Sequence, residues 1–405
     1  MALEKIEMQL KAKLAELETK GFLKGDEKLI TGIKDAEKGF GIRYYLKGYG
    51  KRAFLKMNSN SYLGLAMHPE VIAAETQAAE VFGTSPSAVR FISGSYELHQ
   101  QLEQKLAVFH GRESAMLFSA AYAAVMGVLP QLIDAQTLVV SDALNHNSII
   151  NAIRLSHCGE KAVYPHLDIA ALNEILKRHK GKFKRVCVIT DGIFSMRGDY
   201  APLDEINDVC QQYQDDYQEG VITIVDDSHG IGALGQTGRG TEEYTNTRAD
   251  ILLGTLGKSL GVNGGYVVAS KTVTQYLRET SPFYIYSNPI TASEAAAALK
   301  SLEILDSSVG VALLEKVQLL TKRFRAGLND LGFEILEGEH PIVALLIRDT
   351  EKTAALVKLL FENNILVTGL NYPVVPESEQ EIRLQVSASH TEKDIAYILE
   401  VLAAA

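Results

Sequence analysis

The chain has 405 residues, of which 46% are hydrophobic and 22% charged, and its formal net charge at pH 7 is −10. This composition is that of an ordinary globular enzyme, and such a length usually divides into two domains. The negative charge argues against a nucleic-acid partner, because no basic excess is available to neutralise phosphates. No apolar run reaches the ~18 residues of a membrane helix, and the first residues lack the apolar core of a secretory signal. Three cysteines without close spacing argue against a metal site or a disulfide framework, so we expect a cytoplasmic protein with no membrane span.

The first third of the chain is predicted to be mostly helical, with one small sheet. Residues 3–18 place five aliphatic side chains on one helical face, so we expect a helix that packs on a partner subunit or on the second domain. Residues 40–57 alternate in polarity and contain glycines and aromatics, which favours a hairpin or small sheet. Further helices are expected at 69–82, 96–110 and 121–133, with an ordered loop at 83–95 and a strand at 114–119.

The middle of the chain alternates between short apolar runs and amphipathic stretches. This alternation predicts a mostly parallel, doubly wound sheet with helices on both faces. Strands are expected at 137–140, 186–190, 221–225, 251–254 and 265–269. Helices are expected at 147–156, 168–179 and 203–213.

The pattern changes near residue 291, where a long helix leads into a C-terminal α+β part. Helices are expected near 311–330, 351–363 and 391–403, and strands near 342–347, 365–368 and 382–387. We therefore divide the chain into an N-terminal helix and small-sheet segment (1–56), a large α/β domain (57–290) and a smaller α+β domain (291–405). The active site should lie between the two domains.

One lysine stands in a glycine-rich turn between two of the predicted strands. The sequence of residues 251–269 is ILLGTLGKSLGVNGGYVVA, in which Lys258 is the only charged side chain. A lysine held beside strand ends can be desolvated, which lowers the pKa of its amine and makes that amine a nucleophile. The alternative is a surface lysine in a flexible loop.

A second polar group follows the preceding predicted strand. The nearly continuous apolar run at 221–225 ends in Asp226, and His229 comes three residues later. The carboxyl ends of parallel strands are where open α/β sheets bind ligands. A turn aspartate is the alternative for Asp226, and a buried structural histidine is the alternative for His229. An acid, a histidine and then a lysine in this order fit pyridoxal 5′-phosphate (PLP), which needs an amine for its aldehyde and an acid for its pyridine nitrogen.

These stretches resemble the α-oxoamine synthases, a family of PLP enzymes of fold type I. The resemblance runs from about residue 57 to the C-terminus. It is carried, in family order, by NSYLGLAMHPE (60–70), SDALNHNSII (141–150), TDGIFSM (190–196), VDDSH (225–229), GTLGK (254–258) and IRLQVSASHT (382–391). It implies a mostly parallel seven-stranded sheet, a smaller α+β domain built from both ends of the chain, PLP as cofactor, and a homodimer with a shared active site.

The resemblance also implies roles for the residues that hold the cofactor. Lys258 would bind the aldehyde, Asp226 the pyridine nitrogen and His229 the phenolic oxygen, while His146 would stack on the ring. A histidine that caps a helix start is an alternative, compatible reading of His146. The phosphate would lie at the backbone amides of Ala121 and Tyr122, at Thr255 and at Ser287 of a partner subunit, with Ser195 near the ring. The chain departs from the family pattern here, because the usual pattern has more glycine and an asparagine where this chain has Val125.

Substrate recognition is implied for three further residues. Arg383 matches the arginine that binds the amino acid carboxylate, a task suited to its planar fork, and Asn60 matches an amide beside it. His99 matches a histidine near the acyl-transfer site. An ordinary strand arginine and a structural histidine are the alternatives for Arg383 and His99.

The resemblance implies an enzyme that joins an amino acid to an acyl-CoA and releases CoA. Local matches, including VTGLNYPVVP (367–376), favour the glycine C-acetyltransferase branch, which joins glycine and acetyl-CoA. The 8-amino-7-oxononanoate synthase branch, which uses alanine and a longer acyl thioester, comes second, and residues 40–57 could then line an acyl pocket. An aminotransferase on the same fold and a PLP-binding regulator are the alternatives from other classes.

Overall fold

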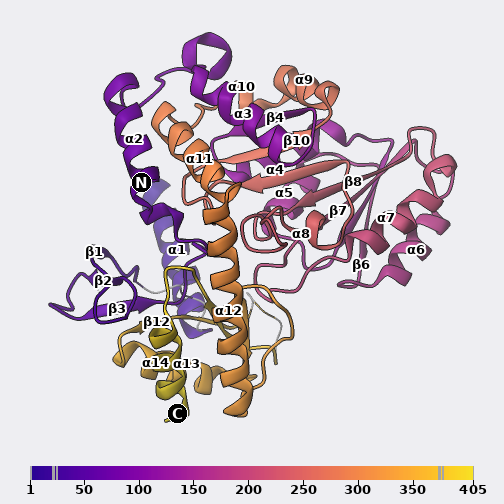
Figure 1. Ribbon diagram of the computed structural model, residues 1–405. Coiled ribbons are helices and arrows are strands. Elements are labelled where there is room, and N and C mark those ends of the chain that lie inside the picture. Colours follow the sequence, from indigo (N-terminus) through magenta and orange to yellow (C-terminus); the bar gives the residue numbers. More distant parts are fainter. Residues whose placement is uncertain (1, 21–22, 24–25, 373–374, 376–377, 405) are drawn as a thin grey trace.

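The computed structural model describes residues 2–20, 23, 26–372, 375 and 378–404. Its largest element is a seven-stranded sheet with the strand order β4-β10-β9-β8-β7-β5-β6 (Figure 1). Only β10 runs antiparallel to its neighbours, so the predicted mostly parallel sheet is confirmed. The strands are β4 (Ser114–Phe118), β5 (Thr137–Asp142), β6 (Glu160–Tyr164), β7 (Arg185–Asp191), β8 (Val221–Asp226), β9 (Ile251–Thr255) and β10 (Gly265–Ala269).

Strand β6 is the one member of this sheet that the sequence pattern does not predict. It lies at the sheet edge beside β5, and most of its side chains are exposed. An edge strand of this kind carries charged residues in place of the apolar run that identifies a buried strand. The segment therefore becomes a strand because it pairs with β5, although its own sequence shows no strand pattern.

Helices cover both faces of the large sheet, as predicted. Alternate residues of each central strand point to opposite faces, so Leu252 joins one core cluster while Ile251 and Leu253 join the other. One face carries α3 (Glu97–Phe109), α6 (Ile169–Arg178), α7 (Leu203–Gln212) and α11 (Ala292–Leu305). The other face carries α4 (Ala121–Leu132), α5 (Asn147–Leu155), α9 (Lys271–Thr280) and α10 (Pro282–Ile285). Neither α9 nor α10 is among the predicted helices.

Both ends of the chain contribute to the smaller sheets. Strands β1 (Ile30–Lys34), β2 (Arg43–Leu46) and β3 (Ala53–Lys56) form an antiparallel meander, of which β2 and β3 confirm the predicted hairpin. Strand β12 (Ile365–Leu366) extends this meander by pairing in parallel with β3. A three-stranded antiparallel sheet follows, made of β11 (Ile342–Leu346), β14 (Glu381–Gln385) and β13 (Thr368–Leu370). Strands β1 and β13 are too short and too exposed to show a clear pattern in the sequence.

The remaining helices connect these parts. The long helix α12 (Ser308–Asp330) runs from the large sheet down to the C-terminal part, where α13 (Thr350–Glu362) and α14 (Glu392–Ala403) lie (Figure 1). Helix α2 (Pro69–Phe82) packs against α11. The predicted loop at 83–95 contains one helical turn, η2 (Arg90–Gly94), and three further short elements complete the fold, which are η1 (Leu65–Met67), η3 (Gln214–Asp216) and α8 (Thr241–Tyr244). None of the described helices combines the length and the apolar character that crossing a membrane requires.

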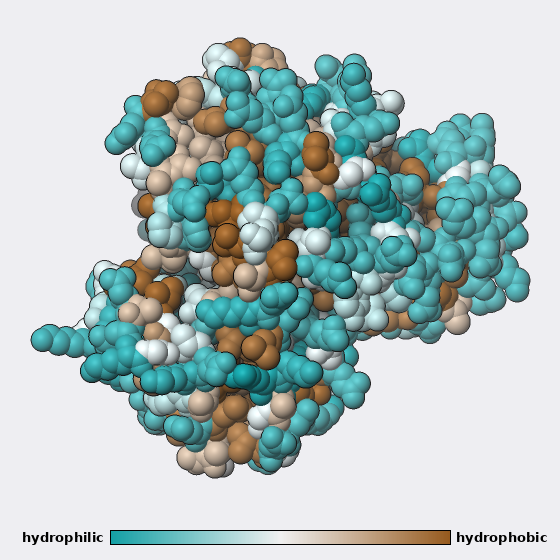
Figure 2. Space-filling model, viewed as in Figure 1, coloured by the Kyte–Doolittle hydropathy of each residue, from teal (hydrophilic) through white to brown (hydrophobic). Residues whose placement is uncertain are grey.

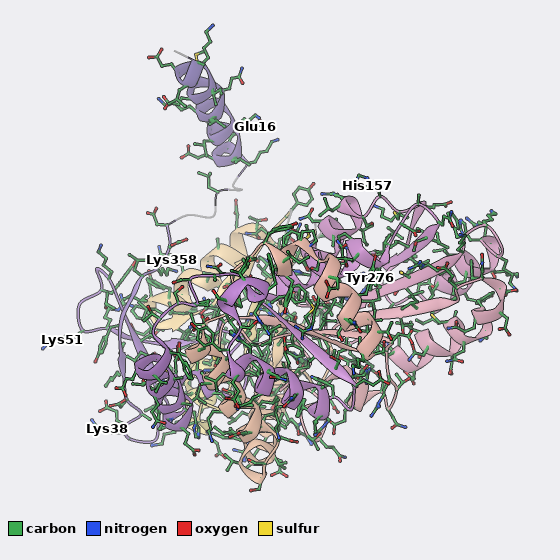
Figure 3. All side chains as sticks on the ribbon, turned by 90° about the horizontal axis from the view of Figure 1, so that it is seen from above. Glu16, Lys38, Lys51, His157, Tyr276 and Lys358 are labelled. Atoms are coloured by element: carbon green, nitrogen blue, oxygen red, sulfur yellow. The ribbon has the colours of Figure 1, made fainter. Side chains whose placement is uncertain are left out.

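The N-terminal helix α1 (Ala2–Thr19) stands away from the rest of the chain. None of its residues is buried, and Figure 3 shows it, with Glu16 labelled, projecting from the body of the molecule. The expected amphipathic helix is therefore present, but its packing on the second domain of the same chain is not observed. Five exposed aliphatic side chains follow its apolar face, which are Leu3, Ile6, Leu10, Leu14 and Leu17.

Candidate active site

The carboxyl ends of three neighbouring strands bring two acids and a lysine together. Asp191 ends β7 and stands opposite Asp226, which ends β8. Strand β9 lies on the other side of β8 and ends at Thr255, three residues before Lys258. The apolar residues of these strands bury them in the sheet, so the polar residues that follow meet at one edge.

The two consecutive aspartates, Asp226 at the end of β8 and Asp227 just after it, have different hydrogen-bond partners. Oδ1 of Asp226 accepts hydrogen bonds from the backbone N–H and the hydroxyl of Ser228, the latter at 2.6 Å. Asp227 is fully buried and accepts from the backbone N–H and the hydroxyl of Thr241, both at 2.7 Å. Asp227 thus anchors the start of α8, and Asp226 is the acid whose charge acts most strongly on Lys258.

Lys258 is held on a turn that Thr255 shapes. The Thr255 hydroxyl donates to the carbonyl of Gly264 at 3.2 Å and accepts from the N–H of Gly257 at 3.0 Å. Burial lowers the pKa of the Lys258 amine to about 8, although the charges of Asp226 and Asp191 oppose this shift. Within the described residues, the amine has no hydrogen-bond or ion-pair partner. A substantial fraction is therefore neutral near pH 8, and a neutral amine can attack an aldehyde.

Asp191 is a site residue that the sequence analysis missed. Its Oδ2 accepts from the backbone N–H of His146 at 2.8 Å, and burial together with the charge of Asp226 raises its pKa well above the ordinary value. The signal was present, because Asp191 ends an apolar run in the same way as Asp226 does. His146 in turn caps α5, because its Nδ1 accepts from the backbone N–H of Ser148 at 3.2 Å. Burial lowers the pKa of the His146 ring, so the ring is neutral.

A second polar group is assembled from segments far apart in the sequence. Arg383, on β14, donates through Nη2 to Oδ1 of Asn60 at 3.1 Å and through Nε to the carbonyl of Ser195. Arg383 is only 8% exposed, and no carboxylate of the described chain forms an ion pair with it. A buried guanidinium without a carboxylate is suited to bind one from a ligand.

His229 lies next to this group. Its Nδ1 is 2.8 Å from the hydroxyl of Tyr62, a fully buried residue that the sequence analysis did not single out. Lys258, Arg383 and His146 all act electrostatically on the His229 ring, which places the four residues in one site.

The start of α4 lies beside Thr255. Gly265 stands opposite Thr255 in the β9–β10 register, and a Cβ on this glycine would lie 2.4 Å from the backbone N of Ala121. The glycine therefore lets the helix start approach the strand ends closely. No side chain caps α4, so the first N–H groups, including those of Ala121 and Tyr122, are free to bind an anion.

Two expected residues are not joined to this group by the contacts of the described chain. His99 is fully buried, with Nδ1 accepting from the N–H of Tyr96 and Nε2 2.8 Å from the carbonyl of Ile290. Both ring nitrogens therefore have structural partners. The Ser287 hydroxyl makes one long contact, at 3.4 Å, with the carbonyl of Asn288. In the stretch 367–376, Pro373, Val374 and Pro376 lie outside the described residues.

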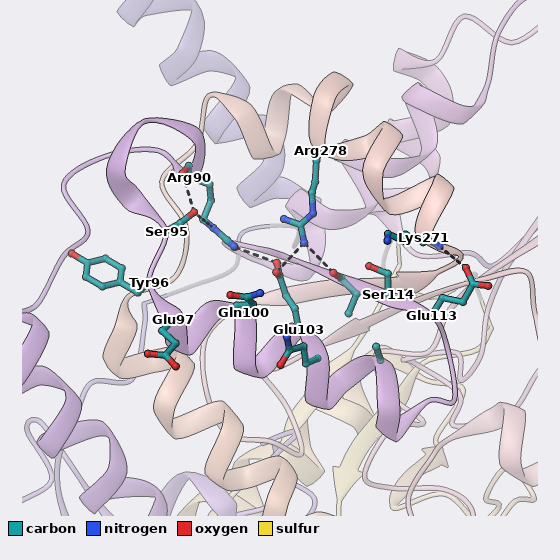
Figure 4. Close-up of a pocket in the computed structure, with 13 residues that line it drawn as sticks. Arg90, Ser95, Tyr96, Glu97, Gln100, Glu103, Glu113, Ser114, Lys271 and Arg278 are labelled. Atoms are coloured by element: carbon teal, nitrogen blue, oxygen red, sulfur yellow. Dashed lines mark hydrogen bonds and ion pairs between the residues drawn. The ribbon is translucent and has the colours of Figure 1, made fainter.

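A separate cavity of about 870 Å³ lies at the surface between α3 and α9 (Figure 4). Arg90 and Arg278 converge there on Glu103, whose carboxylate also accepts from the backbone N–H of Leu117. None of the proposed site residues lines this cavity. Both arginines form ion pairs with Glu103, and we assign the cluster a structural role.

The residues at the strand ends fit PLP as a cofactor. The group needs an amine for its aldehyde, an acid for its ring nitrogen, a flat surface for its ring and backbone donors for its phosphate. Lys258, Asp226, His146 and the start of α4 supply these four features in one place. Asp191 would add a second acid, one with a raised pKa, beside Asp226.

Comparisons with known proteins agree with this chemistry. The model of the aminotransferase class I and II family matches residues 52–402. An 8-amino-7-oxononanoate synthase of Geobacter metallireducens is 40% identical over 88% of this chain and 89% of its own length. The 2-amino-3-ketobutyrate coenzyme A ligase of Escherichia coli is 38% identical over 84% of this chain and 85% of its own. Identity to these two relatives does not separate the two branches considered above.

Solved structures of PLP enzymes also resemble this chain. Serine palmitoyltransferase of Sphingomonas wittichii superposes with a TM-score of 0.88, at 26% identity, over 99% of this chain and 97% of that one. A structure of SPT with PLP bound gives the same TM-score and identity over 98% and 96%. The chain therefore belongs to the aminotransferase class I and II family and, within it, to the PLP-dependent α-oxoamine synthases of fold type I.

Proposed function

We propose that this enzyme transfers the acetyl group of acetyl-CoA to the α-carbon of glycine, forming 2-amino-3-ketobutyrate and free CoA. The observation that carries the proposal is the placement of Lys258. Its amine is close enough to both Asp226 and Arg383 for their charges to act on it. An acid for the cofactor and a cation for the amino acid carboxylate thus face the same nucleophile. The sequence matches at 141–150, 190–196 and 367–376 favour glycine and acetyl-CoA within the family.

Each residue has a defined task in this reaction. When bound, PLP supplies an aldehyde that links to amines and a ring that accepts electrons from the amino acid's α-carbon. Lys258 would hold the cofactor and, once its amine is free, remove the proton from that carbon. Asp226 would keep the ring nitrogen protonated, because a carboxylate stabilises a neighbouring cation. Arg383, oriented by Asn60, would hold the substrate carboxylate.

The other cofactor contacts follow from the same arrangement. His146 would cover one face of the ring, and His229 would donate to the phenolic oxygen. The free N–H groups of Ala121 and Tyr122 and the Thr255 hydroxyl would bind the phosphate, with Ser195 near the ring. His99 would lie near the acyl group only if its ring leaves the contacts described above.

We further propose that the enzyme is a cytoplasmic homodimer and that Ser287 reaches the phosphate of the partner subunit. Large side chains are exposed on both sides of the contact between η2 and α10, where Phe91 is 65%, Ile92 67% and Tyr286 79% exposed. Figure 2 shows other hydrophobic residues gathered between the upper and lower parts of the molecule. The three cysteines are unpaired in the described chain, which supports a reducing compartment. We also propose the division of the chain into the segment 1–56, the large α/β domain 57–290 and the smaller α+β domain 291–405.

A second candidate substrate pair comes from the relatives. Several of them carry the name 8-amino-7-oxononanoate synthase, at 35–40% identity. Alanine and a longer acyl thioester are therefore the alternative substrates, and residues 40–57 would then help to enclose the acyl chain. An aminotransferase is the alternative from a different class, and it would release no CoA.

The test is a matrix of substrates. The PLP-loaded protein is mixed with glycine, alanine or serine, each crossed with acetyl-, octanoyl-, pimeloyl- or palmitoyl-CoA, and the release of free thiol is followed. Release with glycine and acetyl-CoA at the highest kcat/KM is the expected result. Preference for alanine and a longer chain would transfer the protein to the second candidate. The absence of thiol release with every pair would overturn both.

A further inference from the structure

Tyr62 is a buried residue of the proposed site that contacts both His229 and Asn60. Its ring packs edge-on against His340, with the ring centroids 5.1 Å apart at 82°. Its hydroxyl lies 2.8 Å from Nδ1 of His229 and 3.3 Å from Oδ1 of Asn60. His340 also holds the backbone of His229, through Nε2 at 2.9 Å from the carbonyl oxygen. His229 is thus fixed at its ring by Tyr62 and at its main chain by His340.

Only one hydrogen can lie between the Tyr62 oxygen and Nδ1 of His229. Burial lowers the pKa of His229 well below its ordinary value, and the positive charges of Lys258 and Arg383 act in the same direction. The ring is therefore neutral and carries one N–H. Burial raises the pKa of the Tyr62 hydroxyl, so this group keeps its proton and has one hydrogen to donate. Either Tyr62 donates to Nδ1 and Nε2 carries the histidine proton, or Nδ1 donates to Tyr62 and Nε2 is bare.

Arg383 decides between these two arrangements. A guanidinium can only donate, and its charge acts on the Tyr62 oxygen. A positive charge on that side favours a hydroxyl whose oxygen faces Arg383 and whose hydrogen points away, toward His229. The competing acceptor, Oδ1 of Asn60, is farther from the hydroxyl and already accepts from Arg383. The hydrogen of Tyr62 therefore lies on the shorter contact, to Nδ1.

We propose that Tyr62 is a positioning residue that donates to Nδ1 of His229 and so leaves Nε2 as an N–H directed at the cofactor site. This inference rests on the proposed role of His229 toward the phenolic oxygen of PLP. An N–H at Nε2 can donate to that oxygen, whereas a bare nitrogen would face it lone pair to lone pair. No hydrogen bond of the described chain occupies Nε2.

The first experiment reads the tautomer without the cofactor. Long-range ¹H–¹⁵N spectra of the histidine-labelled, PLP-free protein distinguish protonated from bare ring nitrogens, and His229→Asn assigns the signal. We expect Nε2 protonated in the wild type and a mixture of tautomers in Tyr62→Phe. The control is Tyr266→Phe, which removes an equally buried tyrosine–histidine contact, 3.0 Å long, to Nε2 of His110. It should leave the His229 signal unchanged.

The second experiment measures how strongly PLP binds and how its visible band depends on pH. Tyr62→Phe should weaken PLP binding about 2- to 10-fold, the effect of one hydrogen bond. It should also raise, by several tenths of a pH unit or more, the pH at which the visible band of the lysine-bound cofactor changes. Tyr266→Phe should change neither quantity.

The outcomes separate this inference from the proposed function. The role of Tyr62 would be overturned if Nδ1 of His229 is protonated in the wild type. It would also be overturned if Tyr62→Phe keeps both the wild-type tautomer and the wild-type pH dependence of the visible band. Neither result would affect the release of thiol in the substrate test. Failure of the protein to bind PLP through Lys258 would overturn the proposed function, while the tautomer measurement would still stand on its own.

Discussion

Asp191 and Asp226 stand opposite each other at the ends of the parallel strands β7 and β8. Both are buried, and two adjacent buried carboxylates cannot both ionise at low cost. Burial and the charge of Asp226 raise the pKa of Asp191 well above its ordinary value. Asp191 therefore holds a proton more readily than an ordinary aspartate, and its Oδ2 accepts from the backbone N–H of His146.

The raised pKa of Asp191 predicts that an amide at this position is tolerated better than an amide at Asp226. Asp191→Asn keeps a neutral side chain of the same shape, so kcat should stay within about tenfold of the wild type. Asp226→Asn removes the charge that would hold the cofactor's ring nitrogen protonated, so kcat should fall about 10²- to 10⁴-fold although PLP still binds. Steady-state thiol release and PLP absorbance of both variants measure these effects. Equal losses in the two variants would contradict the assignment.

Lys258→Ala should fold but form no covalent cofactor band and no product. In the wild type, the rate at which the PLP-free protein captures PLP should rise with pH through about 8, because the pKa of the buried amine is lowered to this value. Lys271→Ala, which changes an exposed lysine at the start of α9, is the matched control. A capture rate that keeps rising until pH 10 would show that the amine has an ordinary pKa.

His166 lies between Asp142 and Asp199, at 2.9 Å and 3.2 Å. Burial pulls its pKa down, but the hydrogen bonds and charges of the two carboxylates outweigh burial and raise this pKa to about 9. The raised value stabilises the folded state fully below pH 6.5, and this contribution is lost as the pH rises through about 9. His166→Gln should therefore lower the free energy of unfolding by about 2 kcal/mol at pH 6 and by much less at pH 10. Urea unfolding at both pH values tests this, and an equal loss at both would argue for a role in packing alone.

Glu381 shows the opposite pH dependence. It is only 2% exposed, and its Oε1 has no hydrogen-bond partner among the described residues. Burial raises the pKa of its carboxyl to about 7, although Arg197 and Arg383 oppose the shift. The folded state binds this proton more tightly than the unfolded state, so the stability decreases as the pH rises from about 4.5 to 7. Glu381→Gln should abolish that decrease and raise the free energy of unfolding at pH 8 by on the order of 2 kcal/mol. A variant that is less stable than the wild type at pH 8 would refute this reading.

Much of the fold could be predicted because buried parallel strands leave a clear pattern. The apolar runs that end at Asp226 and precede Lys258 identify β8 and β9, and their order implies a shared sheet edge. Edge strands leave no such pattern, which is why β6 was missed. Strands β1 and β13 carry few buried side chains, and each is held by pairing with a strand close in sequence, β1 with β2 and β13 with β14.

Some residues of the proposed site can be predicted from the sequence, and others can be identified only from the structure. Lys258, Asp226 and His229 could be found because they follow buried strands at short spacing. Asp191 follows the same rule and was overlooked. Tyr62 could not be found, because its significance depends on a contact with His229 that spans 167 positions of the chain. The contacts that occupy both nitrogens of His99 are likewise visible only in three dimensions.

The parallel pairing of β3 with β12 has a consequence for how the chain folds. Leu55 finds its strand partner only at Ile365, so the edge of the N-terminal meander stays unsatisfied until nearly the whole polypeptide has left the ribosome. Contacts of such long range form slowly, and an open strand edge invites pairing with other chains. The seven-stranded sheet, complete by residue 269, can form first, and the Arg383–Asn60 contact can be made only when the late segment closes onto the early one. Premature termination after α12 would therefore leave a chain with its lysine in place, an unpaired β3 edge and no arginine to receive the substrate.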